Sequence, residues 1–370
     1  MNCSRLHRIY RSVFSLITIV VFVSSVLSVS AQDIHFSQFY LSPLNLNPSM
    51  TGVMDAQQRA TVHYRNQWAA VAGSSAYNTY SASYDRRVEV GQVDYFGIGG
   101  TLWSDVAGDA NFGTTQAKVS FAYTRKVGGN WSKQVRRNMK KSGLYLSIGA
   151  DAGITQRRVT PGDLRWPSQV TNGVYDPSAG FDEVIPNNNF IYPDLAGGIL
   201  LYGLDQRNNS FYIGAALHHL NQANISFLNR QESLFSRLTI HAGGELRINK
   251  ILSVVPNLVY MSQGPHLEIL PGSAVRFNIG EYEGVKDYFE IGLWGRIVQN
   301  AGTNGGSSSI GSDAIVVYSK FSFSSYSIGF SYDYNVSGLS QAATANGAFE
   351  LSLTYMLFDP NFRGYLSPRF

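Results

Sequence analysis

The sequence predicts an all-β fold, namely an antiparallel up-and-down transmembrane β-barrel of about fourteen strands and of the outer-membrane type. First, apolar residues alternate with small or polar residues along most of the chain, as expected when one strand face meets lipid and the other meets a polar interior. Second, the alternating segments approach the roughly 9 to 11 residues that a tilted strand needs to cross a bilayer. Third, no apolar run after the N-terminus approaches the ~20 residues of a membrane-spanning helix.

The N-terminus is interpreted as a cleaved secretory signal covering residues 1–31. Arg5, Arg8 and Arg11 precede an apolar stretch, which ends in the small-residue pattern Val29-Ser30-Ala31. An N-terminal anchor helix is the alternative, but four serines thin out the end of the apolar stretch. We therefore expect export to the outer membrane of a Gram-negative cell. The remaining organisation is a periplasmic or plug segment over 32–58, a barrel over 59–358 and a tail over 359–370.

Composition excludes several other classes. The only cysteine, Cys3, lies within the predicted signal, so the mature chain has no disulfide, zinc thiolate or cysteine nucleophile. Without the signal, basic and acidic residues nearly balance, so nucleic acid is not a predicted partner.

The strands follow from the alternation in chain order. In the clearest example, Leu144, Leu146 and Ile148 begin one face while Tyr145 and Ser147 begin the other. A soluble sandwich is the alternative, but its strands would be shorter and would not need a second face rich in Gly, Ser, Thr and charge. The predicted strands lie near 59–68, 77–85, 95–103, 117–123, 144–154, 194–202, 211–217, 238–248, 253–261, 266–279, 287–296, 313–319, 326–332 and 349–355.

The connections alternate in length, as in outer-membrane barrels. Long stretches at 156–193, 221–237, 297–312 and 335–347 alternate with tight turns at 203–209, 249–252, 280–286 and 320–325. We expect the long stretches outside the cell and both termini in the periplasm. The exception is the basic stretch 126–142, which would face the periplasm and is either a solvated insertion or a contact for an acidic partner. Its candidate contact residues are Lys133, Arg136, Arg137, Lys140 and Lys141.

Charged residues on the polar strand faces are expected to line a wet lumen. They are Arg65, Lys118, Asp151, Glu245, Arg247, Glu290, Arg296 and Glu350. We expect them to pair with one another rather than to select a solute. Lys118 is expected to pair with Asp151, and Arg65 with Glu350 where the last strand closes against the first. In a hydrated lumen each pair would contribute on the order of 1 kcal/mol or less.

No motif predicts catalysis, a metal or a cofactor. Gly97-Ile98-Gly99-Gly100 lies inside a strand without a following helix, so it is interpreted as wall packing rather than a dinucleotide loop. His218, His219 and His241 lack a completing ligand pattern. The acidic residues of 156–193 lack the spacing of a calcium loop, and no Gly-x-Ser-x-Gly elbow occurs. We therefore expect a protein that is not an enzyme.

The residues after the signal resemble a known family. They read Asp33-Ile34-His35-Phe36-Ser37-Gln38-Phe39-Tyr40, with Leu46-Asn47-Pro48 and Tyr64-Arg65-Asn66-Gln67-Trp68 following. This pattern resembles the PorP/SprF outer-membrane proteins of the type IX secretion system of Bacteroidota. The sequence departs from the family pattern at Phe349, where a histidine is expected, and in a tail from Asp359 to Phe370.

The resemblance implies a barrel without enzymatic activity that assists export or surface anchoring of secreted proteins, typically adhesins with a C-terminal sorting domain, in secretion or gliding motility. It also implies a periplasmic partner that binds peptidoglycan, besides outer-membrane lipid. Alternatives are a porin-like diffusion or uptake channel and a barrel enzyme.

Overall fold

The computed structural model describes residues 33–68, 73–90, 94–108, 110–128, 143–171, 173–181, 183–205, 209–282, 285–300, 309–337 and 346–358. The predicted signal, the C-terminal tail and all five basic candidates from Lys133 to Lys141 lie outside these ranges. The chain divides into two compact units, Met1–Asp33 and Ile34–Phe370. Within the described residues, no helix is both long and apolar enough to cross a membrane.

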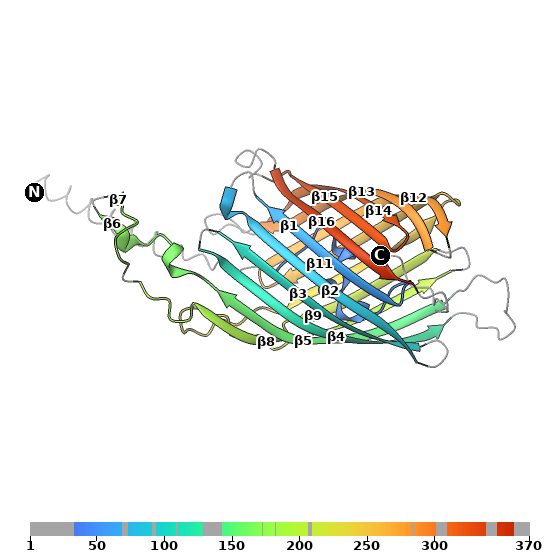
Figure 1. Cartoon of the computed structure of the whole chain (residues 1–370), viewed down its shortest axis with the longest axis horizontal. Coiled ribbons are helices and arrows are strands. Elements are labelled where there is room, and N and C mark those ends of the chain that lie inside the picture. The colour runs from blue at the N-terminus through green and yellow to red at the C-terminus, as the bar shows by residue number, and fades with distance from the viewer. Residues whose placement is uncertain are drawn as a thin grey trace, which may run out of the picture. The chain divides into compact units, whose positions relative to one another are not determined.

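The second unit is a closed antiparallel barrel of fourteen strands, which confirms the predicted fold (Figure 1). Each strand pairs with its neighbours in chain order, and β1 closes against β16 over ten residue pairs. The barrel strands are β1 (Gln58–Gln67), β2 (Tyr77–Val90), β3 (Asp94–Ala107), β4 (Phe112–Gly128), β5 (Gly143–Arg158), β8 (Asn189–Leu204), β9 (Ser210–His218), β10 (Arg237–Arg247), β11 (Leu252–Gln263), β12 (His266–Tyr282), β13 (Val285–Asn300), β14 (Ser309–Phe323), β15 (Tyr326–Asn335) and β16 (Asn346–Leu357).

Several strands are longer than predicted. They span 9 to 17 residues, and β4 and β12 are the longest. The reason is that the cross-strand ladder continues where the outward side chains turn polar, as at exposed Arg125 on β4. Hydropathy alternation marks only the part of a strand that meets lipid, so it underestimates the strand's length.

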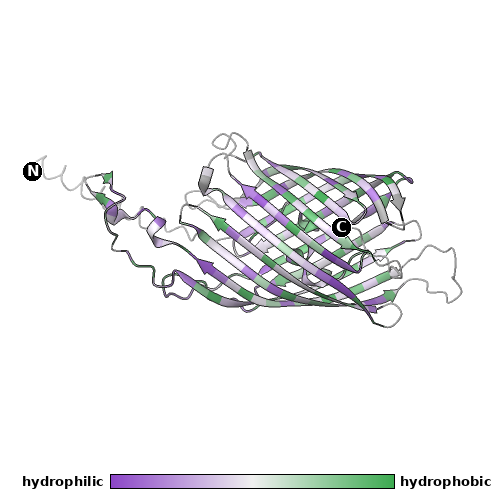
Figure 2. Ribbon diagram, in the orientation of Figure 1, coloured by the Kyte–Doolittle hydropathy of each residue, from purple (hydrophilic) through white to green (hydrophobic). Residues whose placement is uncertain are grey.

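The side chains alternate across the wall as the period of two requires. On β5, Ile148 is 58% exposed whereas Ser147 is fully buried. Exposed Leu102, Val119 and Leu293 occupy the same outward face on other strands, and apolar residues recur along the strands among more polar ones in Figure 2. The apolar set therefore faces outward, as a barrel in lipid requires.

The two ends of the barrel differ. At the first end, which we call the long-loop end, the connections 159–188 and 219–236 are long. Two other connections at this end, 108–111 and 264–265, are short turns. At the other, here the turn end, the connections 248–251 and 324–325 are tight, and β1 begins and β16 ends there. β4 ends and β5 begins at the turn end as well.

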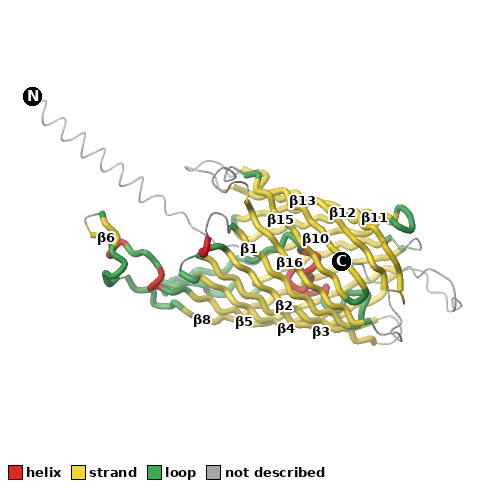
Figure 3. The backbone as a smooth tube through the Cα atoms, turned by 45° about the horizontal axis from the view of Figure 1, so that its top comes forward, coloured by secondary structure: helices red, strands yellow, loops and turns green. Residues whose placement is uncertain are grey.

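Residues 34–54, here the plug, cross the interior of the barrel. They contain three short helices, η1 (Phe39–Leu41), α2 (Pro43–Leu46) and η2 (Pro48–Met50), seen inside the strands in Figure 3. The carbonyl of Ile34 accepts from Arg237, which begins β10 at the long-loop end, and the carbonyl of Met54 accepts from Arg87 near the turn end. The plug thus runs the length of the lumen before β1 starts.

Candidate functional site: the plug and the lumen ion network

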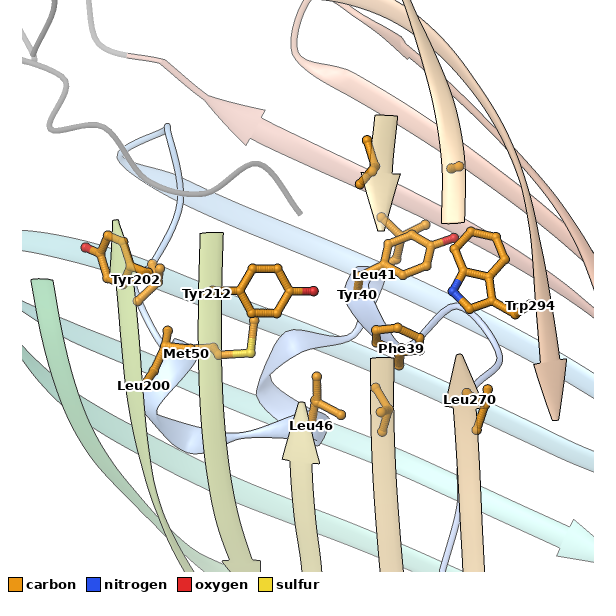
Figure 4. Packing of buried hydrophobic residues seen from close by; sticks show 14 of the residues in the cluster. Phe39, Tyr40, Leu41, Leu46, Met50, Leu200, Tyr202, Tyr212, Leu270 and Trp294 are labelled. Carbon is orange, nitrogen blue, oxygen red and sulfur yellow. The ribbon is translucent and has the colours of Figure 1, made fainter. Parts of the chain in front are cut away.

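The lumen is packed rather than wet, contrary to the sequence-based expectation. Buried apolar side chains of the plug meet apolar wall residues in one cluster, shown in Figure 4. The ring of Tyr40 stacks on Trp294 with centroids 5.7 Å apart and meets Tyr318 edge-on. Labelled members of the cluster are Phe39, Tyr40, Leu41, Leu46 and Met50 of the plug, and Leu200, Tyr202, Tyr212, Leu270 and Trp294 of the wall. The sequence did not predict these lumen-facing apolar residues, because the alternating pattern treats every lumen-facing position as one that contacts water.

Wall glycines let the backbone of the plug approach the strands. A Cβ added to Gly149 would lie 2.6 Å from the carbonyl oxygen of Pro48, and one added to Gly97 would overlap the backbone of Thr51. Asn47, between α2 and η2, reaches the carbonyls of Ile199 and Ala215 with its side-chain amide. Gly97 is therefore a packing glycine of the wall, as its position inside a strand indicates.

Substituting one of these glycines tests the close approach. We expect Gly149→Val to destabilise the barrel by about 1–3 kcal/mol, because the new side chain overpacks against η2. The matched control is Gly280→Val in β12, where an added Cβ would meet no atom within 4 Å. Thermal unfolding in detergent measures both variants, and equal midpoints would contradict the contact.

A carboxylate on β16 holds the start of the plug. Glu350 is fully buried and accepts from the backbone N–H groups of Ser37 at 2.7 Å and Gln38 at 2.9 Å. Arg65, directly opposite on β1, forms an ion pair with Glu350, and His63 Nε2 lies 3.2 Å from the same carboxylate. The seam pair named from the sequence thus also binds the plug, and we call this set the latch.

A second arginine extends the latch. Arg296 Nη2 lies 2.6 Å from Asp333 Oδ2 and also hydrogen-bonds the hydroxyl of Ser37. The same Asp333 oxygen lies 3.2 Å from Arg65. Pairing registers shift beside both Arg296 and Asp333, and such bulges re-aim side chains.

Lys118 and Asp151 meet, although not directly opposite each other. Lys118 Nζ lies 3.4 Å from Asp151 and 2.9 Å from Asp194 on β8, whereas the register sets Asp151 opposite Ser120. Asp194 also lies 2.8 Å from His219 Nδ1. Lys118 therefore bridges two carboxylates contributed by consecutive strands of the wall.

A third group joins β10, β12 and β13. Arg276 lies 2.8 Å from Glu245 and 2.7 Å from Glu290, and all three are buried. Arg247 lies farther along β10, with its backbone N–H donating to Asn209. Among the described residues, no ion pair joins Arg247 to another of the predicted charges.

Sequence reasoning missed several members of these groups. They are Asp194, Glu268, Arg276, Asp333, His63 and His219, together with the buried pair Arg59–Asp85. Arg276 and Glu268 occupy the polar face of the predicted strand 266–279, so the alternation already contained the signal for both. The three histidines considered as ligands instead bond Leu46, Asp194 and Asn47. No group of three or more metal-ligating side chains occurs in the described part of the chain.

His35 gives the plug a testable dependence on pH. Its Nε2 lies 3.7 Å from Glu268, and burial, with Arg65 and Arg296 nearby, lowers the pKa of His35 to about 3. The unfolded chain therefore binds a proton on His35 below about pH 6.5 that the folded chain does not bind. The contribution of His35 to the free energy of unfolding is therefore lost as the pH falls from about 6.5 toward 3.

We therefore expect the free energy of unfolding of the His35→Gln variant to fall less steeply than that of the wild type between about pH 6.5 and pH 3. Chemical unfolding of both proteins in detergent at several pH values measures the difference in slope. Parallel curves would contradict a His35 that is neutral in the folded chain.

At the long-loop end, two long connections contact each other. The N–H of Asn187 donates to Phe227 O, and Phe190 meets Phe227 edge-on. Beyond them, η4 (Pro161–Asp163), η5 (Pro167–Gln169) and the hairpin β6 (Val170–Thr171) and β7 (Val174–Tyr175) form a lobe over 161–184. Trp166 stacks on Phe181 in this lobe, while Val174 and Val184 are 68% and 77% exposed.

No curated protein sequence was found to match this chain. Solved structures similar to it include the deltaS2 mutant of the TodX monoaromatic hydrocarbon channel, with a TM-score of 0.44 and 10% identity over 86% of this chain and 94% of that chain. CdiB from Acinetobacter baumannii has a TM-score of 0.43 and 6% identity over 81% of this chain and 60% of that one.

The family comparison covers most of the sequence. The model of the type IX secretion system membrane protein PorP/SprF matches residues 28–355, a range that contains the plug, the latch and nearly all of the barrel. The chain therefore belongs to the PorP/SprF family of type IX secretion system membrane proteins, as the residues after its N-terminal apolar stretch indicate.

Proposed function

We propose that this protein is a non-enzymatic accessory of type IX secretion that holds a secreted protein, such as an adhesin with a C-terminal sorting domain, at the cell surface or assists its export. Family membership carries the proposal. The packed plug supports an accessory role, because a polypeptide could cross this lumen only after the apolar cluster and the latch had been displaced. The cargo would therefore contact the barrel at its long-loop end rather than pass through it.

The lobe is the surface we assign to the cargo. It lies beyond the ends of β5 and β8, its Trp166–Phe181 stack orders it, and it keeps Val174 and Val184 exposed. Rigid apolar side chains outside the lipid are typical of protein contacts. Export by a cleaved signal, with the long-loop end outside the cell, belongs to the same proposal.

The turn end would then meet the periplasmic partner. We propose that the basic connection between β4 and β5 attracts an acidic surface of a peptidoglycan-binding protein. Its candidate residues lie outside the described residues, so the support is their charge in the sequence.

Affinity purification from native outer membranes tests the proposal. We expect a large secreted protein with a C-terminal sorting domain to copurify with the wild type, and Val174→Ser with Val184→Ser to reduce its recovery. The matched control is Val88→Ser with Val90→Ser, which changes two exposed valines near the turn end. Recovery of uptake components in place of a secreted protein would favour the porin-like alternative.

A further inference from the structure

Two prolines interrupt the wall of the barrel. Pro256 lies within β11 and Pro271 within β12, and both side chains are exposed on the outward face. Proline has no N–H and cannot donate to a cross-strand ladder, so it is rare inside sheets. Each proline here has a paired strand on both sides.

The pairing of β10 with β11 skips the position of Pro256. The ladder runs to Gly243 opposite Asn257 and resumes at Leu246 opposite Val254, with the register unchanged. Pro256 therefore lies opposite Gly244, and the hydrogen bond that an N–H at position 256 would donate to the Gly244 carbonyl is not made.

The pairing of β12 with β13 is interrupted in the same way. The ladder runs to Ile269 opposite Ile297 and resumes at Gly272 opposite Trp294, again without a change of register. Pro271 thus lies opposite Gly295, whose carbonyl loses its cross-strand donor. The same proline–glycine arrangement occurs on both outer sides of one hairpin.

The hairpin itself is paired without a gap. β11 and β12 pair at every position from Leu252 opposite Phe277 to Gln263 opposite His266. By comparison, β3 and β4 pair without interruption from Tyr95 opposite Thr124 to Ala107 opposite Phe112. The β11–β12 hairpin is therefore a continuous unit bounded by two seams that each lack a backbone hydrogen bond, while Arg276 of the hairpin forms ion pairs across them with Glu245 and Glu290.

The hairpin contacts the plug mainly through apolar side chains. Val255, Val259 and Leu270 belong to the cluster around Phe39 and Leu46. The hydrogen bonds of the latch reach β1, β13, β15 and β16, and Glu268 of the hairpin lies 3.7 Å from His35 and 3.9 Å from Arg296. Movement of the hairpin would separate Glu268 from His35 and Arg296 but leave the contacts of Glu350 and Asp333 with the plug in place.

We propose that the β11–β12 hairpin is a deformable panel of the barrel wall, which opens toward the membrane along the two proline-interrupted seams while the plug stays latched. Opening separates Arg276 from Glu245 and Glu290 and exposes the apolar cluster of the lumen to the lipid. The physical basis is that a backbone carbonyl without a donor is costly in a lipid environment, so the backbone ladder is weaker at Pro256 and Pro271 than an uninterrupted ladder. The inference rests on the fold and is independent of the proposed function.

Hydrogen–deuterium exchange of the whole protein in detergent micelles tests the panel. We expect backbone amides along the two seams, in peptides covering 238–247 and 291–298, to exchange at least about tenfold faster than the matched β3–β4 ladder. Pro256→Val with Pro271→Val restores both N–H groups, and we expect it to slow this exchange to the β3–β4 level. Equal protection of these ladders in the wild type, or no slowing in a folded double variant, would overturn the proposal.

Disulfide staples provide a second measurement if the valine variant does not fold. With Cys3→Ser the chain has no other cysteine, so Ala242→Cys with Leu258→Cys links β10 to β11, and Ser273→Cys with Leu293→Cys links β12 to β13 at directly paired positions. We expect the oxidised staples to slow exchange of the panel and reduction to restore it. Exchange that is unchanged on oxidation would also overturn the proposal.

Discussion

Replacing Glu350 by alanine is expected to destabilise the barrel by about 3–5 kcal/mol, because the substitution leaves buried partners without their carboxylate. Arg65, His63 and the N–H groups of Ser37 and Gln38 all converge on Glu350 in the folded protein. A hydrated lumen would have predicted a loss near 1 kcal/mol. The larger loss of stability is expected because the interior is packed, and Glu350 and Arg65 are only 0% and 2% exposed.

Thermal unfolding in detergent, followed by the mobility change of the folded barrel on gels, measures this loss. Glu89→Ala on β2 is the matched control, because Glu89 is exposed and its loss should change stability by less than about 0.5 kcal/mol. In the double variant with Arg65→Ala we expect a coupling energy of about 0.5–3 kcal/mol. A loss for Glu350→Ala no larger than that of Glu89→Ala would show that the latch does not hold the plug.

The strands of the wall could be predicted from the sequence because the outward side chains of every strand face lipid. Ile148 and Ser147 differ in exposure for the reason that the alternation assumes. Arg65 and Glu350 could be named as a closing pair because β1 must meet β16 in any closed barrel. Their direct opposition additionally required the register, which the structure supplies.

The remaining parts of the site depend on contacts that no strand pattern encodes. Lys118 meets Asp194 because the 159–188 connection returns β8 beside β5. Ser37 and Gln38 reach Glu350 through backbone N–H groups, which every residue type except proline possesses. The dry interior likewise follows from the path of residues 34–54, and polarity on the strands gave no indication of it.

Replacing the plug by a flexible chain is expected to convert a closed barrel into a conducting one. Residues 34–54 fill the lumen with an apolar cluster, whereas an emptied barrel of fourteen strands encloses far more space than an eight-stranded barrel, whose side chains fill it. We expect a Gly-Ser segment of equal length in place of 34–54 to raise ion conductance in planar bilayers by about tenfold or more over the wild type.

The matched control replaces residues 163–183 of the lobe by the same kind of segment, and it should conduct like the wild type because the lumen is unchanged. Porin-like conductance of the wild type would instead support the diffusion channel, and a folded but closed plug variant would show that residues 34–54 are not what closes the lumen.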